Sequence, residues 1–167
     1  MGHKLGAAPS CATKVSVILN AVVTRQVTSV VSARPAPAHP ALLAGALDAP
    51  LPGNVSAGRG IEINGWVIPS NGNQIDGVFA VVEEVQGHLH PLQIHRPDVV
   101  QDYPSAAAAN TGFSFWCAVP ELATARIQLV SRFSSGEVVP LVDLQVAIEQ
   151  EEVPEATSEM RAVSAPD

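Results

Sequence analysis

Residues 125–133 read Ala-Arg-Ile-Gln-Leu-Val-Ser-Arg-Phe, so that mostly apolar side chains alternate with arginine and glutamine. Successive side chains of a β-strand point to opposite faces, and this pattern is typical of a strand with one buried face. Ser134-Ser135-Gly136 then predicts a turn, and residues 142–149 alternate again. The stretch therefore predicts a hairpin packed on a hydrophobic core. Pro140 favours an edge position for the second strand, because proline has no N–H to donate.

The same alternation is found in residues 113–119. The apolar face of this predicted strand consists of Phe113, Phe115, Cys117 and Val119. Trp116 falls on the opposite face, and a sandwich strand has one face directed outward. We therefore weigh two positions for Trp116: an exposed site that could contact a ligand, or a place in the core.

Stretches earlier in the sequence predict further strands. Residues 75–85 are apolar on both faces around their centre, which is typical of a central strand. In residues 61–68 the polar face turns apolar after Gly65, so we expect a bulge there that turns Trp66 toward the core. Shorter candidate strands cover residues 47–51 and 89–94. About seven short strands at turn-marked spacing predict an all-β fold, an antiparallel β-sandwich.

The two ends of the chain differ from its middle. Residues 15–24 alternate enough to permit one strand, and residues 33–40 contain three prolines, which predicts a stiff linker. We therefore expect residues 1–46 to form an N-terminal extension and residues 47–149 to form the sandwich. Residues 150–167 are rich in glutamate and small residues, and we expect a disordered acidic tail there.

The composition argues against nucleic-acid binding and against a transmembrane helix. The net charge is −7 and lysine occurs only at Lys4 and Lys14, so the sequence offers no basic stripe for nucleic acid. The longest apolar stretch, Val15 to Val23, is interrupted by polar residues and is too short for a transmembrane helix. Two cysteines cannot form a disulfide framework, which leaves the compartment open. We interpret Cys117 as a small buried hydrophobe.

Five short motifs, in this order and spacing, resemble a bacterial immunoglobulin-like module: Pro50-Leu51-Pro52-Gly53, Gly65-Trp66, Arg96-Pro97-Asp98-Val99, Tyr103-Pro104 and Gly112-Phe113. The resemblance covers about residues 47–148. It implies an immunoglobulin-like sandwich and a non-catalytic role, as an accessory domain beside glycosyltransferases, sulfotransferases, methyltransferases or surface proteins. It implies a protein partner or a neighbouring enzyme domain, in the bacterial cytoplasm or cell envelope. It supplies no catalytic residues.

The motif Arg96-Pro97-Asp98 has a structural interpretation and a functional one. Pro97 suits the first position of a helical turn over residues 98–103, and Asp98 can accept bonds from nearby backbone amides as a cap. Arg96 would then pair with a carboxylate or with strand-end carbonyls. The alternative is that the guanidinium of Arg96 binds a ligand. We favour the structural interpretation, in which Gly65, Trp66, Gly112 and Phe113 also serve as scaffold.

His88, His90 and His95 form the one metal candidate that the sequence offers, with Asp98 close by. Their spacing matches no closed structural zinc pattern, so we expect neither metal nor cofactor. No serine stands in a Gly-x-Ser-x-Gly elbow. Glu83 and Glu84 would point to opposite faces of a strand, which separates two carboxylates that general acid–base chemistry needs together.

The sequence thus predicts a non-catalytic interaction or spacer module with a protein partner, and not an enzyme. The alternative is a carbohydrate-binding module that stacks a sugar on an exposed Trp116. Three arrangements would separate these hypotheses. A flat exposed aromatic surface at Trp116 favours a glycan, three convergent histidines favour a metal, and an uncovered apolar sheet edge favours a protein.

Overall fold

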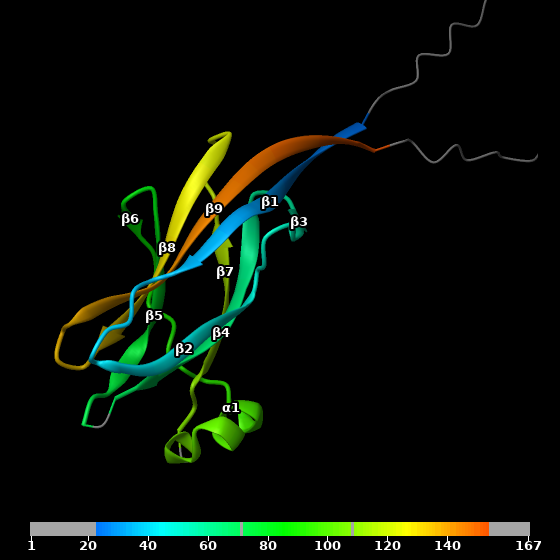
Figure 1. The fold of residues 1–167 in the computed structure, drawn as a ribbon. Helices are drawn as coiled ribbons and strands as arrows, with labels where there is room; N and C mark the ends of the chain where they lie inside the picture. Colours follow the sequence, from blue (N-terminus) through cyan, green and yellow to red (C-terminus); the bar gives the residue numbers. More distant parts are fainter. Residues whose placement is uncertain (1–22, 71, 108, 154–167) are drawn as a thin grey trace, which may run out of the picture.

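The computed structural model describes residues 23–70, 72–107 and 109–153. These residues form nine β-strands and two short helices (Figure 1). The elements are β1 (Val23–Pro35), β2 (Leu42–Ala49), β3 (Val55–Ala57), β4 (Gly60–Pro69), β5 (Ile75–Val82), β6 (Val85–Gln86), α1 (Pro97–Asp102), the 3-10 helix η1 (Pro104–Ala106), β7 (Gly112–Ala118), β8 (Thr124–Phe133) and β9 (Val138–Val153). Neither described helix is long and apolar enough to cross a membrane.

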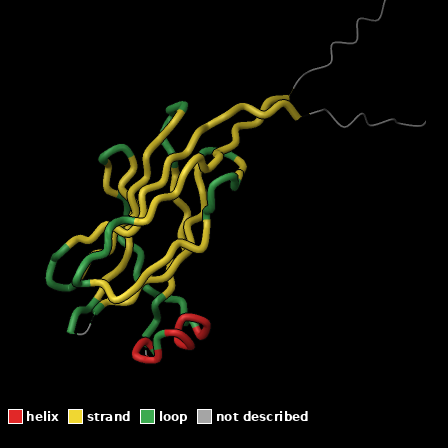
Figure 2. Tube along the Cα trace, viewed as in Figure 1, coloured by secondary structure: helices red, strands yellow, loops and turns green. Residues whose placement is uncertain are grey.

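The strands form two antiparallel sheets that pack on each other as a β-sandwich, which confirms the predicted fold class. The larger sheet has the order β3-β1-β9-β8-β5-β6, and the smaller has the order β2-β4-β7. Figure 2 shows the two helices together at one end of the strands. The structure has nine strands where the sequence predicted about seven, because β1 and the short strands β3 and β6 were not expected and the strand predicted at residues 89–94 did not form.

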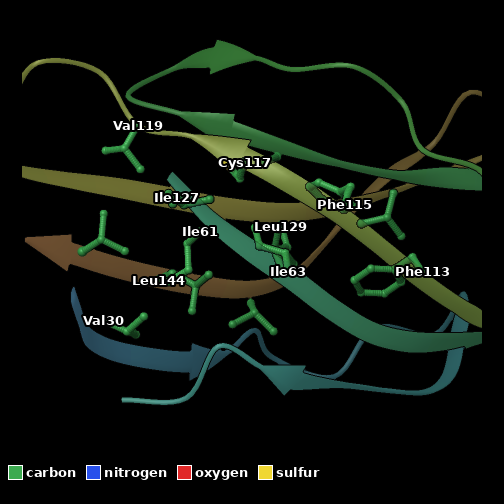
Figure 3. Packing of buried hydrophobic residues seen from close by; sticks show 14 of the residues in the cluster. Val30, Ile61, Ile63, Phe113, Phe115, Cys117, Val119, Ile127, Leu129 and Leu144 are labelled. Atoms are coloured by element: carbon green, nitrogen blue, oxygen red, sulfur yellow. The ribbon is translucent and has the colours of Figure 1, made fainter. Parts of the chain in front are cut away.

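The hydrophobic core lies between the two sheets (Figure 3). The alternation in residues 125–133 places Ile127 and Leu129 in this core with no exposed surface. Ile63 of β4 is equally buried, and Phe113 and Phe115 of β7 pack in the same cluster. Burial of apolar surface on this scale is the main favourable contribution to folding. The period-two pattern in the sequence therefore identified the inward faces of β7 and β8 correctly.

The start of the sandwich differs from the prediction. β1 pairs with β9 from Val23↔Val153 to Pro35↔Val142, and Val30 lies in the main core. Residues 23–46 therefore belong to the sandwich, whereas we expected it to begin at residue 47. β9 likewise continues to Val153, past the predicted boundary. The predicted strand at 15–24 lies outside the described residues except for Val23 and Thr24.

The prediction of an edge position for the last strand is wrong. β9 lies between β1 and β8 in the larger sheet. Pro140 is tolerated in this inner strand because the pairing of β9 with β1 ends at Val142, so that only β8 adjoins β9 at Pro140. The missing N–H is therefore not needed by a second neighbour.

The expected continuation of β5 through Val85 is also wrong. β5 ends at Val82, and Glu83 and Glu84 adopt positive φ values of 45° and 70° in a tight turn that leads into β6. Two successive residues with positive φ form the turn that suits the twist of a β-hairpin. The two carboxylates therefore do not lie on opposite faces of one strand. Glutamate is not typical at such positions, which explains why the sequence did not reveal this turn.

Candidate functional site

A groove of about 670 Å³ opens on one side of the sandwich, between β7 of the small sheet and the β5–β6 hairpin of the large sheet. We call it the β7 groove. Core side chains form part of its lining: Ala80, Phe115, Cys117 and Val119. Exposed apolar side chains also line it: Val85, Trp116 and Leu122. The groove therefore gives access to the interior between the two sheets.

The groove exists because the segment between β6 and α1 closes only part of the side of the sandwich between β5 and β7. Residues 87–94 pass from the large sheet to the small one. His90 exchanges two backbone hydrogen bonds of 2.8 Å with Val78 of β5, and Ile94 forms a bridge with Gly112 of β7. The predicted strand at 89–94 is thus an irregular connection with one bridge to each sheet. The end of β7 near Trp116 lies beyond these bridges, and no other described segment pairs with its free edge.

Trp116 points away from the core, as one of the two sequence interpretations held, and 54% of its surface is exposed. Its indole lies over Gly60 at the start of β4. A Cβ at position 60 would come within 2.5 Å of Cε2 and Cζ2 of the ring. Glycine at this position lets the ring approach the backbone, so that the sheet supports the indole from beneath. Val85 and Leu122, exposed by 70% and 46%, also line the groove.

The three candidate histidines do not converge. His88 and His90 line the groove, but His95 does not. The ring of His90 stacks on Phe115 with a centroid distance of 4.1 Å and an interplanar angle of 2°. Burial lowers the pKa of His90, and the neighbouring His88 lowers it further. Within the described residues, no three His, Cys, Asp or Glu side chains lie close enough together to hold a metal ion.

The charged side chains that line the groove are acidic. Glu83 and Glu121 are among the lining residues, which include no lysine or arginine. Glu83 accepts a hydrogen bond of 2.6 Å from the backbone N–H of Arg126. Glu121 forms an ion pair with Arg59, whose Nε donates to Oε1 of Gln26 at 2.6 Å. These contacts connect the rim of the groove to the first described strand, β1.

Cys117 contributes a thiol to the groove lining and is buried, as the sequence predicted. Burial raises the pKa of this thiol to about 11. The thiolate is the nucleophilic form of cysteine, so Cys117 is mostly unreactive at neutral pH. Its Sγ contacts the backbone oxygen of Ala118 at 3.8 Å. This environment is that of a packing residue.

The Arg96 motif joins elements of the scaffold. Arg96 donates to both carboxylate oxygens of Asp98, at 2.9 and 2.6 Å, and to Asp48 of β2 at 2.5 Å. The bond to Asp98 raises the pKa of Arg96 most, and the bond to Asp48 raises it further. The same bond with Arg96 is the main cause that lowers the pKa of Asp98 to about 2. Pro97 begins α1 as expected. The N-cap residue of α1 is Arg96, which makes no side-chain cap bond because its guanidinium binds the Asp98 carboxylate. Hydrogen bonds from the backbone N–H groups of Asp98 and Val99 also lower the pKa of Asp98, as expected for a carboxylate that accepts from nearby amides.

Trp66 lies on the outer face of the small sheet and not in the main core as we expected. The bulge that we expected at Gly65 of β4 is instead on β2, the neighbouring strand. The register shifts at Asp48 of β2, while β4 pairs with β7 without interruption. Trp66 therefore keeps its alternating position and is half-buried. Tyr103, just after α1, packs on it with a centroid distance of 5.7 Å. A small second core of Ile68, Val99 and Ala106 lies against them.

A second cavity of about 460 Å³ lies at the opposite edge of the small sheet, along β2. Its lining includes Trp66, Phe113, Leu47 and His39. β2 carries two register shifts, at Leu43 and at Asp48, so its free edge is irregular. The β7 groove is the larger of the two, and its lining includes Trp116, His88 and His90, which are ligand or metal candidates from the sequence.

No protein family, curated protein or solved structure matches this chain. The functional argument therefore rests on the residues of the β7 groove.

Proposed function

We propose that this protein is a non-catalytic interaction module that binds another protein through the β7 groove. The observation that carries the proposal is the group of exposed apolar side chains, Trp116, Val85 and Leu122, that lines a groove open to the core. Contiguous exposed apolar surface is typical of interaction sites, and tryptophan is enriched among the residues that dominate binding energy. The uncovered sheet edge beside this surface favours a protein partner over the other classes.

The chemistry of the groove supports a binding role. A buried thiol with a raised pKa is a poor nucleophile, and the ring of His90 is stacked on Phe115. Nucleophilic catalysis needs a base within hydrogen-bond reach of the nucleophile. Among the described residues, the hydrogen bond made by Cys117 Sγ goes to a backbone oxygen and not to a histidine.

The resemblance to bacterial immunoglobulin-like modules adds a context to the proposal. It suggests a partner that is an enzyme or surface protein acting on carbohydrate or on the cell surface, or a neighbouring enzyme domain for which this module is a spacer. The groove would then be the contact between this module and that protein.

One observation favours a second candidate, a carbohydrate-binding module. The Trp116 indole lies against Gly60 with more than half of the residue exposed, and an aromatic face suits the C–H groups of a sugar ring. Glu62, directly opposite Trp116 in the register of β4 and β7, is exposed and could accept hydrogen bonds from sugar hydroxyls. A glycan would need Trp116 but little of the apolar groove beside it.

The experiment compares the full chain with Trp116→Ala and Val85→Ser, using a glycan array and affinity capture followed by calorimetry on the purified partner. Val138→Ser is the matched control, because Val138 is exposed by 50% and does not line the groove. Protein binding weakened about tenfold or more by both groove variants, and kept by the control, supports the proposal. Glycan binding that only Trp116→Ala abolishes supports the alternative. Partner binding that neither groove variant changes would overturn the groove as the site.

A further inference from the structure

The connection from β6 to α1 borders the β7 groove and is held by few backbone contacts. It is hydrogen-bonded to the sheets near its two ends, at Gly87 and at Gln93. Among the described residues, the backbone hydrogen bonds between these two positions are the pair of 2.8 Å that His90 exchanges with Val78 of β5. The backbone of residues 88–92 is therefore attached to the large sheet through His90.

The side chain of His90 attaches the same residue to the small sheet. Its ring lies parallel to that of Phe115 of β7, with the two centroids 4.1 Å apart, and Phe115 belongs to the main core. The backbone of His90 can approach β5 because residue 77 is a glycine, and a Cβ there would collide with the carbonyl oxygen of His90. One titratable residue thus connects the segment to both sheets.

The surroundings of the His90 ring disfavour a charge on it. Burial lowers the pKa of His90 most, the exposed His88 lowers it further, and no carboxylate raises it. The carboxylate of Glu83 accepts a hydrogen bond from the backbone of β8, and Glu121 is paired with Arg59. The titratable side chains that line the groove with His90 come from its own segment, from the turn after β5, and from β7 and the loop after it: His88, Glu83, Cys117 and Glu121.

The attachment through His90 therefore depends on pH. Histidine ordinarily titrates near pH 6.5, and a His90 with a lowered pKa binds a proton more readily when its ring is in water than when it is stacked. The stabilisation by the neutral ring is complete above about pH 6.5 and is lost as the pH falls through the lowered pKa. Leu92 packs against the core, so the part that can be released is residues 88–91.

We propose that residues 88–91 are a pH-sensitive flap of the β7 groove, held closed by the neutral ring of His90 and released when that ring is protonated. Release uncovers the face of Phe115 and extends the groove toward the core. The effect on binding rests on the proposed function, since it needs the groove to be the site that a partner contacts. The movement of the flap itself needs no partner. Mild acidification would then regulate the binding surface.

The test measures amide hydrogen exchange of His90 and Val78, the two donors of the bridge, in the full chain at about pH 7.5 and about pH 5. Protection factors, which are corrected for the intrinsic effect of pH on exchange, should fall at least about fivefold at the lower pH. The upper limit is about 30-fold, the ratio that an unperturbed pKa of 6.5 sets at pH 5. The fall should follow the titration of the His90 ring as measured by NMR.

His90→Phe is the matched variant, because phenylalanine can stack on Phe115 in the same way and cannot be protonated. Its protection factors at residue 90 and at Val78 should be equal at the two pH values. His88→Gln removes the neighbouring charge, so the pH at which protection falls should rise. The amide of Leu129, in the core of β8 between β5 and β9, reports global unfolding and should keep its protection at both pH values.

Equal protection of His90 and Val78 at both pH values in the wild type overturns the inference, and would show that the charged ring stays on Phe115 through cation–π attraction. A similar fall in His90→Phe, or a parallel fall at Leu129, also overturns it, because the cause is then not protonation of His90. Failure of the proposed function is a separate result. If Trp116→Ala does not change binding of the purified partner at neutral pH, the groove is not the binding site, and the exchange measurement on the flap still stands.

Discussion

The two tryptophans of this protein lie on the same outer face of the small sheet, at its opposite ends. Trp66 is opposite Gly112, and Trp116 is opposite Glu62, in one uninterrupted register between β4 and β7. At the Trp66 end, Tyr103 and the helices α1 and η1 cover the face (Figure 2). At the other end, Trp116 is exposed and borders the groove.

The difference shows that a tryptophan on an outward face acquires its role from what the chain places above it. The connection between residues 94 and 112 contains α1 and η1, and Arg96 holds the start of α1 to β2 through Asp48. No comparable segment among the described residues lies over Trp116. We therefore interpret the Trp66 end as a stabilising second core and the Trp116 end as a binding surface.

Replacement of the two tryptophans by alanine tests this comparison with the largest expected effect. Trp66→Ala should lower the free energy of unfolding by about 3 kcal/mol, because it removes a half-buried ring that packs on Tyr103 and on the small core. Trp116→Ala should cost less than about 1 kcal/mol, because its side chain is mostly exposed. Urea denaturation followed by far-UV circular dichroism measures both. Equal losses would show that the two ends do not differ in this way.

The two glycines near the tryptophans should also respond differently to a methyl group. At Gly65 a Cβ would lie 2.5 Å from the backbone oxygen of Ala46 and 2.7 Å from Cζ of Phe113. Backbone cannot move aside cheaply, so Gly65→Ala should destabilise the protein by about 2 kcal/mol in the same urea experiment.

Gly60→Ala is the matched variant at the exposed end. Its Cβ would meet the Trp116 ring, and a side chain without cover can rotate away from it. We expect a loss below about 1 kcal/mol, together with a shift in Trp116 fluorescence measured in a Trp66→Phe background. A loss as large as that of Gly65→Ala would mean that the Trp116 ring is held as firmly as backbone.

Arg96→Ala tests the connection that holds the cover in place. The Arg96 side chain is only 20% exposed and binds Asp48 and Asp98. Loss of these charge-assisted hydrogen bonds should cost about 1–2 kcal/mol and increase hydrogen exchange in α1. The control is Arg126→Ala, which breaks an ion pair with Asp143 in which the arginine is 67% exposed, and it should cost at most about 0.5 kcal/mol. An Arg96→Ala variant as stable as this control would argue against the connection.

The smallest expected effect is on how the stability of the fold depends on pH. The hydrogen bond from Arg96 lowers the pKa of Asp98 from 3.8 to about 2. A folded-state pKa below the unfolded value gives stability that is present above about pH 4 and is lost as the pH falls toward 2. Wild type should therefore lose stability more steeply over this interval than Asp98→Asn, as thermal unfolding would show. If Asp98→Asn keeps the wild-type slope over this interval, the pairing does not contribute.

Local pattern predicted much of the fold because side-chain alternation depends only on the period of a strand. The inward faces of β7 and β8 and the buried Cys117 followed from it, and the helical turn after Pro97 followed from the chemistry of proline at the start of a helix. For Trp116 the sequence left two positions open, of which the structure has the exposed one. The turn at Glu83 and Glu84 was missed for a local reason, the use of glutamate at positive φ. Two other errors depended on neighbours distant in sequence. Pro140 is tolerated because β1 ends opposite Val142, and the bulge near Gly65 lies on β2.

By itself, the sequence determined that this protein is an all-β sandwich with inward faces that can be identified on the strands over residues 113–119 and 125–133. These properties follow from local alternation and turn chemistry, which a short window of residues contains. Only the tertiary structure decided that α1 covers Trp66, that residues 87–94 leave one end of β7 open, and that His95 is separated from His88 and His90. Such placements depend on contacts between residues far apart in the chain, and no local period encodes which segments will meet.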